Sequence, residues 1–310
     1  MTILCVCLSA AIQRTLSFDD FEKGAVNRTS VFREDAGGKA LNAARVLNQI
    51  ERGCARALCP VGTENGARFL ELARRDGIDV VAVPVPGNVR DCWTLLSRGG
   101  STTEVVADEH LELAAERAKQ IERELLSQFA HEIESCDALL LAGSTPAHFA
   151  TGTNQKLCEC AKRAGKLILA DFCGPPLRAA LAEKNSVPDF VKINEEELLK
   201  TFTDGSAKKS ETPELIASLS EKYGAAFIIT RGKKATVASM GGTHFMCETE
   251  DVVPVNTTAC GDSFSAGFLH EVMKSKKPGG VLAPSDFAAA LRRGTFAAAR
   301  NAENIIPGKI

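Results

Sequence analysis

The residues best suited to carry out chemistry lie in the stretch Thr257-Thr258-Ala259-Cys260-Gly261-Asp262. Apolar residues recur at helical spacing at Phe264, Phe268 and Val272, so the stretch is expected to turn from a loop into a helix N-terminus. The first N–H groups of a helix lack partners within it, and the aligned peptide dipoles add partial positive charge. The sequence therefore predicts an anion site there, with Asp262 beside it.

The same residues also have a purely structural explanation. A glycine-aspartate pair before a helix often serves as an ordinary helix cap. The chain contains neither a G-x-x-x-x-G-K-[ST] phosphate loop nor a G-x-G-x-x-G fingerprint. The lack of these motifs argues against P-loop NTPases and dinucleotide dehydrogenases, so a nucleotide would have to be held in another way.

The elements expected around this stretch alternate between short apolar strands and amphipathic helices. This alternation predicts a parallel β-sheet that is covered by helices on both faces and holds ligands at the carboxyl ends of its strands. Residues 34–38 are expected to form a glycine-bearing loop before a helix that begins near Lys39. The other important loops follow predicted strands, at Gly143-Ser144-Thr145-Pro146, Asp171-Phe172-Cys173-Gly174, Asn194-Glu195-Glu196-Glu197 and Thr230-Arg231-Gly232.

Two segments interrupt the alternation and predict a second, smaller sheet. Each has two runs of β-branched or apolar residues separated by a turn, which is typical of a hairpin. The runs are Thr15–Phe21 and Val26–Val31, then Cys92–Ser97 and Thr103–Ala107, the last two joined by residues 98–101. We expect residues 13–33 and 88–107 to form a small β-sheet lid inserted into a single α/β domain over residues 1–310.

The composition limits the classes of partner. With 37 Lys and Arg against 39 Asp and Glu, the net charge of −2 gives no broad attraction to nucleic acid or to an acidic membrane. No apolar run approaches the roughly 20 residues that span a bilayer, and the N-terminus lacks the basic region of a signal peptide. The eleven scattered cysteines are typical of reduced thiols. A cytoplasmic protein with a small-molecule partner is expected.

Five motifs stand in order along the chain: Gly37-Gly38-Lys39 with Asn42, Gly143-Ser144-Thr145-Pro146, Lys192-Ile193-Asn194-Glu195-Glu196-Glu197, Thr230-Arg231-Gly232 and Thr257-Thr258-Ala259-Cys260-Gly261-Asp262. Their order and spacing resemble the ribokinase-like, PfkB-type carbohydrate kinases over nearly the whole chain. Within that family, Gly24-Ala25-Val26-Asn27-Arg28 looks most like the 1-phosphofructokinase and tagatose-6-phosphate kinase branch. The resemblance implies a Rossmann-like α/β fold, a β lid that also makes a homodimer contact, and transfer of the γ-phosphoryl group of ATP to a sugar hydroxyl with Mg²⁺.

The resemblance also implies a role for each residue of the opening stretch. Asp262 would accept the proton of the attacking hydroxyl. The N–H groups of Ala259, Cys260 and Gly261 would hold the transferring phosphoryl group. Because the helix dipole favours the charged form of a nearby carboxylate, Asp262 is expected to remain ionised.

The sugar substrate is expected near the glycine pair and the second lid segment. Lys39 and Arg90 would bind a phosphate group already on the sugar, because an ammonium and a forked guanidinium suit a phosphate dianion. The acceptor would then be a ketohexose phosphate of the fructose 1-phosphate or tagatose 6-phosphate type. Arg90 could instead be a solvated lid residue. Further substrate contacts are expected from Gln13, Gly37, Gly38, Asn42 and Ser144.

The resemblance places ATP and Mg²⁺ at later strand ends. Asn194 and Glu197 would organise Mg²⁺ through water, since this ion usually keeps several waters. The same two residues also match a capping box at a helix start, and both roles can hold together. Further cofactor contacts are expected from Lys192, Asn194, Thr230, Gly232 and, beside the adenine, Asn301.

Two departures from the family pattern bear on function. Gln13 stands where the branch usually has an aspartate that accepts hydrogen bonds from sugar hydroxyls, which puts the sugar's identity in question. Ala259-Cys260 replaces the usual Gly-Ala, so a Cβ at residue 259 restricts a positive φ and Cys260 adds a candidate modifiable thiol. Two alternatives therefore stay open: a kinase of an unphosphorylated sugar or nucleoside, and a sugar-phosphate sensor that has lost catalysis.

Overall fold

The main sheet of the computed structural model has nine strands within the described residues, in the order β13-β12-β11-β10-β9-β8-β1-β4-β5. The structure describes residues 1–97, 102–107, 113–203, 211–275 and 282–310. Neighbouring strands run parallel from β5 to β11, whereas β12 and β13 form an antiparallel edge. The bounds are Ile3–Val6 (β1), Ala55–Gly62 (β4), Asp79–Val85 (β5), Ala138–Ala142 (β8), Leu167–Asp171 (β9), Phe190–Asn194 (β10), Ala226–Arg231 (β11), Lys234–Met240 (β12) and Thr243–Cys247 (β13).

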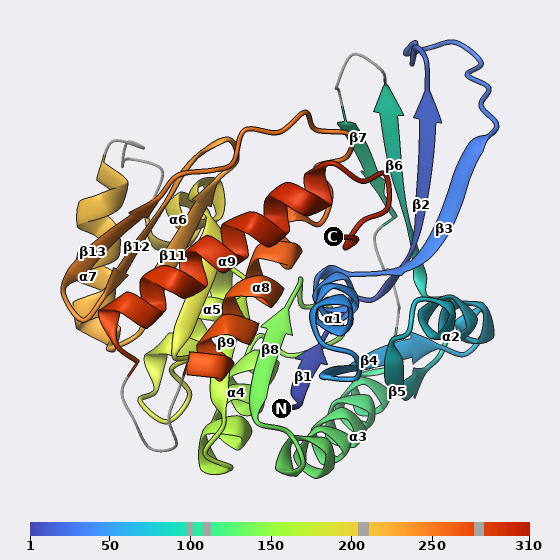
Figure 1. Cartoon of the computed structure of the whole chain (residues 1–310). Helices are drawn as coiled ribbons and strands as arrows, with labels where there is room; N and C mark the ends of the chain where they lie inside the picture. Colours follow the sequence, from blue (N-terminus) through green and yellow to red (C-terminus); the bar gives the residue numbers. More distant parts are fainter. Residues whose placement is uncertain (98–101, 108–112, 204–210, 276–281) are drawn as a thin grey trace.

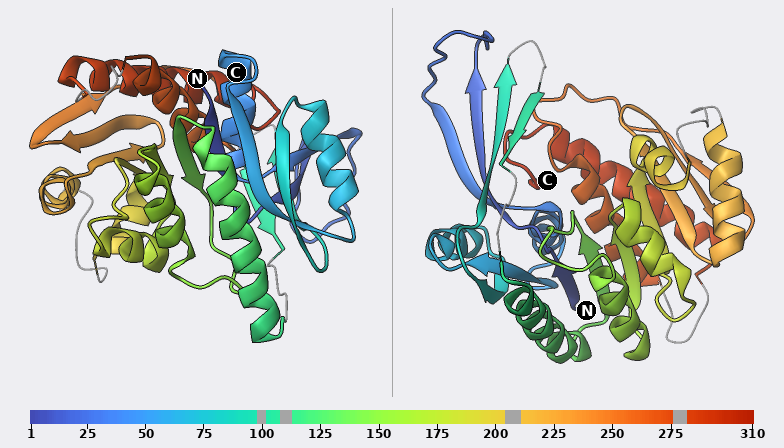
Figure 2. Two further views of the ribbon diagram at one scale, coloured as in Figure 1. Left: turned by 90° about the horizontal axis from the view of Figure 1, so that it is seen from below. Right: turned by 180° about the vertical axis from the view of Figure 1, so that it is seen from behind.

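Helices cover both faces of this sheet, as Figures 1 and 2 show. One face packs against α1 (Lys39–Ile50), α2 (Gly66–Arg75), α8 (Cys260–Ser275) and α9 (Pro284–Ala302). The other packs against α3 (Ala115–Glu134), α4 (Thr153–Arg163), α5 (Gly174–Ala182), α6 (Glu195–Phe202) and α7 (Thr212–Tyr223). Side chains alternate along each strand, so Leu140 of β8 enters the first core while Leu139 and Leu141 enter the second. A fully apolar strand is therefore required here, and the predicted two-sided parallel sheet is confirmed.

A second sheet, with the order β3-β2-β6-β7, stands apart from the first (Figure 1). Its strands are β2 (Ala11–Phe18), β3 (Val31–Gly37), β6 (Arg90–Ser97) and β7 (Thr102–Val106). The pairing of β2 with β6 is parallel and joins the two predicted hairpins into one sheet. The expected turn over residues 98–101 lies outside the described residues. That this sheet works as a lid on a single domain stays a prediction.

The prediction for the first hairpin was wrong in its second strand. β3 begins at Val31 and extends to Gly37, so residues 34–37 form a strand and not a loop. They pair with β2, with Gly37 opposite Ala11 and Asp35 opposite Gln13. Polar residues hid this strand from the hydrophobic pattern, because Glu34 and Asp35 are compensated by arginines: Glu34 by Arg14 of β2, and Asp35 by Arg75 of α2 and by Arg33 of the same strand.

Two glycines allow α8 and α9 to pack closely. A Cβ at Gly267 of α8 would lie 2.7 Å from the carbonyl oxygen of Arg293, and a Cβ at Gly294 of α9 would lie 2.9 Å from that of Phe264. Such separations are too short for real side-chain contacts, so glycine is needed for the approach of the helices. This packing fixes α8, whose first turn carries Asp262.

In the described part of the chain no helix is long and apolar enough to cross a membrane.

Replacing Gly267 by alanine tests this packing. Alanine favours helix over glycine, but overpacking against the backbone of α9 should outweigh that gain and lower the free energy of unfolding by about 1–3 kcal/mol. Urea denaturation measures the change. Gly152→Ala is the control, because a Cβ there would meet only the side chain of Gln155 at 3.9 Å. Equal or greater stability of Gly267→Ala would show that the helices are not limited by this contact.

Candidate active site

A buried carboxylate, Asp171, joins four elements at the carboxyl ends of the central strands. It ends β9, is fully buried, and receives hydrogen bonds from three side chains. The Lys192 ammonium of β10 lies 2.8 Å from Oδ2, and that of Lys39, at the start of α1, lies 3.3 Å from Oδ1. Ser265 of α8 donates to Oδ2 over 2.7 Å. We call Asp171, Lys39, Lys192 and Glu197 the Asp171 cluster, since Lys39 also contacts Glu197 at 3.1 Å.

The charges of this cluster stabilise one another. Burial by itself raises the pKa of Asp171, but the charges of Lys192 and Lys39 outweigh it and hold the pKa down to about 2. In turn, the negative charge of Asp171 raises the pKa of Lys39 above its usual range, against the effect of burial and with help from Glu197. Both lysines therefore present fixed positive charge at this edge. Asp171 was not predicted as a site residue, although a carboxylate that ends a wholly apolar strand was a signal that could have identified it.

Asp262 lies in the first turn of α8, and only 7% of its surface is exposed. Burial and the nearby negative charge of Asp171 raise its pKa to about 6, although Lys39, Lys192 and Asn42 oppose the shift. The expected ionisation of Asp262 at neutral pH agrees with this value, but its pKa is raised and not lowered, because desolvation outweighs the dipole at the helix end. Asp262 still releases its proton below neutral pH. A carboxylate with a pKa so close to neutrality suits proton transfer.

The predicted anion site is only partly free. Ala259 has a φ of 67°, the left-handed conformation that disfavours a side chain with a Cβ. The N–H of Cys260 donates to the carbonyl of Thr257 over 3.2 Å, so this group is not available as expected. Among the described residues, the N–H groups of Ala259 and Gly261 donate no hydrogen bond. A Cβ at Gly261 would lie 2.7 Å from the Lys192 ammonium. Glycine at this position therefore allows the Lys192 ammonium to lie close to the start of α8.

The thiol of Cys260 is less reactive than expected for a modifiable cysteine. Burial raises its pKa, although a hydrogen bond from Asn301 opposes the shift. A raised pKa lowers the fraction of thiolate, which is the reactive form. The sulfur of Cys260 accepts a hydrogen bond from the amide nitrogen of Asn301 over 3.3 Å, and modification of this thiol stays a prediction.

The glycine pair has a packing reason of its own. Gly38 has a φ of 115°, and a Cβ there would lie 2.8 Å from the sulfur of Cys7. A Cβ at Gly37 would lie 2.8 Å from the Cβ of Gln13. Both glycines therefore let β3 and α1 approach β1 and β2, a need within the protein that the sequence interpretation did not include.

Asn42 and Arg90 occupy different parts of the site. The amide nitrogen of Asn42 donates to Asp262 Oδ2 over 2.9 Å, so Asn42 contacts the candidate base directly. Arg90 donates to the carbonyl of Ser9 over 3.2 Å, and Ser144 donates to the Ser9 hydroxyl over 3.1 Å. The Nε of Arg90 is buried and has no hydrogen-bond partner among the described residues. Arg90 therefore keeps an unused donor, and in the described parts of the chain it makes no hydrogen bond to Lys39.

Gln13 lies within the second sheet, in β2. Its amide nitrogen donates to the hydroxyl of Thr94 over 2.8 Å, and both residues lie on neighbouring strands. The second sheet also reaches the candidate anion site, because Thr258 donates to Glu104 of β7 over 3.1 Å. This contact brings β7 to the loop before α8.

Among the expected cofactor residues, Asn194 and Glu197 form the predicted capping box of α6. Asn194 Oδ1 accepts from the N–H of Glu197, and Glu197 Oε2 accepts from the N–H of Asn194, both over 2.8 Å. Thr230 lies in β11, and Gly232 follows that strand with a φ of 61°. Asn301 is fully buried and donates to the carbonyl of Thr258 while accepting from the N–H of Gly308. Nucleotide contacts for Thr230, Gly232 and Asn301 stay predictions.

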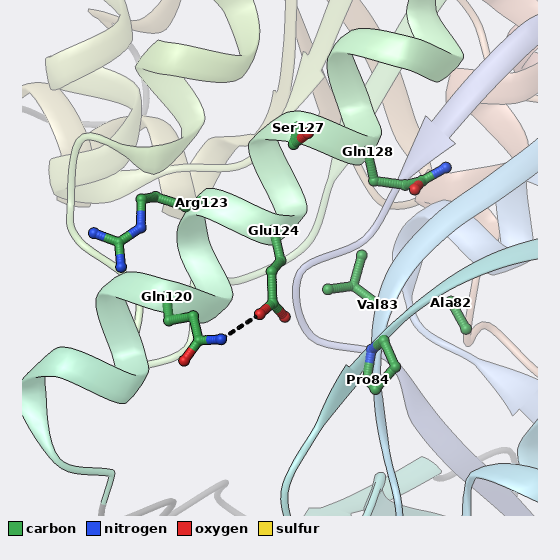
Figure 3. Close-up of a pocket in the computed structure, with 8 residues that line it drawn as sticks. All are labelled: Ala82, Val83, Pro84, Gln120, Arg123, Glu124, Ser127 and Gln128. Atoms are coloured by element: carbon green, nitrogen blue, oxygen red, sulfur yellow. Dashed lines mark hydrogen bonds between the residues drawn. The ribbon is translucent and has the colours of Figure 1, made fainter.

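One pocket of about 470 Å³ lies away from these residues, between β5 and α3. Figure 3 shows its lining side chains, among them Pro84 of the edge strand and Arg123 and Glu124 of α3. None of the predicted site residues lines it. The chemistry of the chain is concentrated at the strand ends and not in this groove.

Comparison with known structures places the protein in the ribokinase-like class of α/β proteins. A possible 1-phosphofructokinase from Thermotoga maritima matches with a TM-score of 0.85 at 16% identity, over 99% of this chain and 93% of that one. A ribokinase from Giardia lamblia matches with a TM-score of 0.76 at 18% identity, over 99% and 96% of the two chains. At these identities the comparison shows the fold alone.

The sequence comparison is more specific. The model of the pfkB family carbohydrate kinases matches residues 2–304, so the chain belongs to this family and is a phosphotransferase enzyme. A 1-phosphofructokinase from Bacillus subtilis strain 168 is 27% identical over 289 residues, which cover 88% of this chain and 86% of that protein. The sequence resemblance to the 1-phosphofructokinase branch is confirmed.

The buried charge of Asp262 gives a prediction for stability. Its folded pKa of about 6 lies above the usual value of 3.8, so the ionised form destabilises the fold above pH 6, and the effect disappears as pH falls toward 4. Asp262→Asn should therefore raise the free energy of unfolding at pH 7.5 by an amount on the order of 1–3 kcal/mol, and much less at pH 4.5.

Urea denaturation at both pH values measures this difference. Asp286→Asn is the matched control, since Asp286 is the third residue of α9 as Asp262 is of α8. The pKa of Asp171 is lowered to about 2, so its own contribution is lost only below the pH range compared. A gain for Asp262→Asn that is the same at both pH values would contradict a raised pKa.

Proposed function

We propose that the protein transfers the γ-phosphoryl group of ATP to a hydroxyl of a ketohexose phosphate, of the fructose 1-phosphate or tagatose 6-phosphate type. The observation that carries this proposal is Asp262, a buried carboxylate at a helix N-terminus with a pKa near neutrality and two fixed lysine charges close by. The Bacillus subtilis relative, a 1-phosphofructokinase, supports the acceptor class. Membership of the pfkB family supports the reaction type.

In this reaction the hydroxyl oxygen of the sugar forms a new bond to the γ-phosphorus. The bond from that phosphorus to the oxygen bridging it to ADP breaks, and ADP leaves with the bonding electrons. The proton of the hydroxyl passes to the carboxylate of Asp262. Lys192, whose ammonium lies against Gly261, and the free N–H groups of Ala259 and Gly261 would stabilise the charge on the transferring group.

The residues present fit a Mg²⁺ ion that is held mainly by the nucleotide. No group of three or more histidine, cysteine or acidic side chains able to hold a metal occurs in the described ranges. Mg²⁺ commonly takes few protein ligands and keeps waters and phosphate oxygens. Asn194 is exposed, and Glu197 is partly exposed at the same edge, so both would contact the ion through water. When bound, the ion would neutralise charge on the phosphates of ATP.

The sugar would lie between the Asp171 cluster and the second sheet. Arg90 offers a buried, unpaired Nε as a donor for a phosphate group, and Lys39 supplies a second cation. Asn42, Ser144 and Gln13 would contact sugar hydroxyls. Because Gln13 has donors as well as an acceptor, the hydroxyl geometry it recognises differs from that of an aspartate.

The second sheet also offers a surface for a homodimer. Val31, Phe32, Val105 and Val106 are about half exposed on β3 and β7. Apolar side chains on an open sheet are often covered by a partner, so we propose a dimer through this sheet. For a sugar-phosphate kinase with this composition we propose a cytoplasmic location.

Activity measurements test the role of Asp262. A panel of sugar phosphates, free sugars and nucleosides is incubated with ATP and Mg²⁺, and ADP release is followed. With a ketohexose phosphate, we expect Asp262→Asn to lower kcat by at least about 10³-fold while KM changes little, because a base acts only in the transition state. For the wild type, kcat/KM should fall as pH drops below about 6, where Asp262 of the free enzyme is protonated. Equal turnover by wild type and variant would refute the assigned base.

Substitution of Arg90, a proposed phosphate-binding residue, helps to distinguish three functions. These are a kinase of a ketohexose phosphate, a kinase of an unphosphorylated sugar or nucleoside, and a sugar-phosphate sensor without catalysis. Arg90→Met should raise KM for the sugar phosphate by about 10-fold or more and change kcat far less, because a ground-state contact to phosphate is lost. Arg123→Met, on the exposed face of α3, is the control. An unchanged KM, with better turnover of a free sugar or nucleoside, would favour the unphosphorylated acceptor. Calorimetric binding of a sugar phosphate without any turnover would favour a sensor.

A further inference from the structure

One buried cation near the candidate base has no part in the proposed chemistry. Arg45 lies one helical turn after Asn42 in α1, and only 5% of its surface is exposed. Its Nη1 donates to Oδ1 of Asn42 over 2.9 Å. The amide nitrogen of Asn42 in turn donates to Asp262 Oδ2, also over 2.9 Å. Arg45, Asn42 and Asp262 therefore form a continuous chain of hydrogen bonds.

The chemistry of the guanidinium sets the direction of this chain. A guanidinium has donors only and does not lose its proton in proteins, so the atom of Asn42 that faces it must be the oxygen. The amide nitrogen then has to face Asp262. We propose that Arg45 is a positioning residue that fixes the amide of Asn42 so that it donates to Asp262 and cannot present its oxygen. The consequence for catalysis rests on the proposed function, whereas the consequence for the protonation of Asp262 does not.

Arg45 is well placed to act as a rigid anchor. Asp76, at the end of α2, accepts from its Nε and Nη2 at 3.2 and 3.0 Å. The carbonyl of Ala36 in β3 and that of Pro307 near the C-terminus accept further hydrogen bonds. Four residues, Asn42, Asp76, Ala36 and Pro307, accept hydrogen bonds from the guanidinium, and the charge of Asp76 balances that of Arg45. Arg45 therefore influences Asp262 through the Asn42 hydrogen bond more than through its electrostatic field.

The orientation of Asn42 matters because the other groups facing Asp262 carry fixed charges. Asp171 of β9 favours the protonated form of Asp262, whereas Lys39 of α1 and Lys192 of β10 favour the ionised form. An amide that donates also favours the ionised form. If the amide turned, two acceptors would face each other, and only a protonated Asp262 could restore the hydrogen bond. Arg45 thus keeps the amide nitrogen of Asn42 turned toward Asp262, where it favours the ionised form of Asp262, as the two lysines do.

Titration of Asp262 in an Arg45→Met variant tests the proposal. The carboxyl carbons of aspartate are labelled with ¹³C, and the signal of Asp262 is identified by its loss in Asp262→Asn. We expect Arg45→Met to raise the pKa of Asp262 by about one unit, and the acid limb of the kcat/KM profile to move by the same amount. Arg45→Met should add nothing in an Asn42→Ala background.

A neighbouring residue provides the matched control. Gln49, one turn further along α1, contacts the same C-terminal segment through Gly308 and Ile310 but makes no hydrogen bond to Asn42 in the described structure. Gln49→Met should loosen that segment and leave the titration of Asp262 unchanged. If Arg45→Met fails to fold, Arg45→Met with Asp76→Leu removes both buried charges and serves in its place.

Two outcomes would overturn the proposal. One is an unchanged titration of Asp262 in the folded Arg45 variant, and the other is an equal shift in Gln49→Met. The NMR titration needs no substrate, so it gives its result even if no sugar phosphate is turned over. Failure of the kinase proposal and failure of the Arg45 proposal are therefore seen in different measurements.

Discussion

The interaction on which the site depends is the burial of Asp171 between two lysines. A carboxylate that is fully buried would be costly alone, but Lys39, Lys192 and Ser265 compensate it. These partners come from α1, β10 and α8, elements that are far apart in the chain. One ionic cluster therefore fixes the relative positions of the strand ends, the glycine-bearing helix start and the helix that carries Asp262. Its value lies in specifying geometry more than in stability, since buried ion pairs contribute little net free energy.

The same cluster explains why Asp262 differs from an ordinary aspartate. Two buried carboxylates share one region, and the two lysines cannot compensate both equally. Asp171 has direct contacts with both ammonium groups and stays ionised, whereas Asp262 receives a side-chain hydrogen bond from Asn42 alone within the described ranges and takes the higher pKa. The division of roles between the carboxylates thus follows from their hydrogen-bond partners. The proposed phosphoryl transfer would use this combination, because it requires fixed positive charge and a proton acceptor close together.

Much of the site is positioned by parts of the chain that carry no chemistry. Close packing of α8 on α9 through Gly267 and Gly294 fixes the position of the first turn of α8. Asn256 accepts and donates hydrogen bonds that tie the loop before α8 to the C-terminal segment. Asn301, which the resemblance placed beside the adenine, performs a similar task with its amide buried beneath Thr258. Residues that resemble ligand contacts in sequence can therefore be supports of the loops that make the contacts.

The sequence by itself determined the two-sided sheet, most of its strands and the positions of the motifs, because apolar periodicity and glycine placement act over a few residues. It also predicted the capping box of Asn194 and Glu197, which is local. It could not reveal β3, whose polar residues are stabilised from other elements, or the roles of Asp171 and Arg45, whose partners lie far away in the chain. Only the tertiary structure decided the pKa of Asp262, since burial and the charge of Asp171 outweigh the local helix dipole.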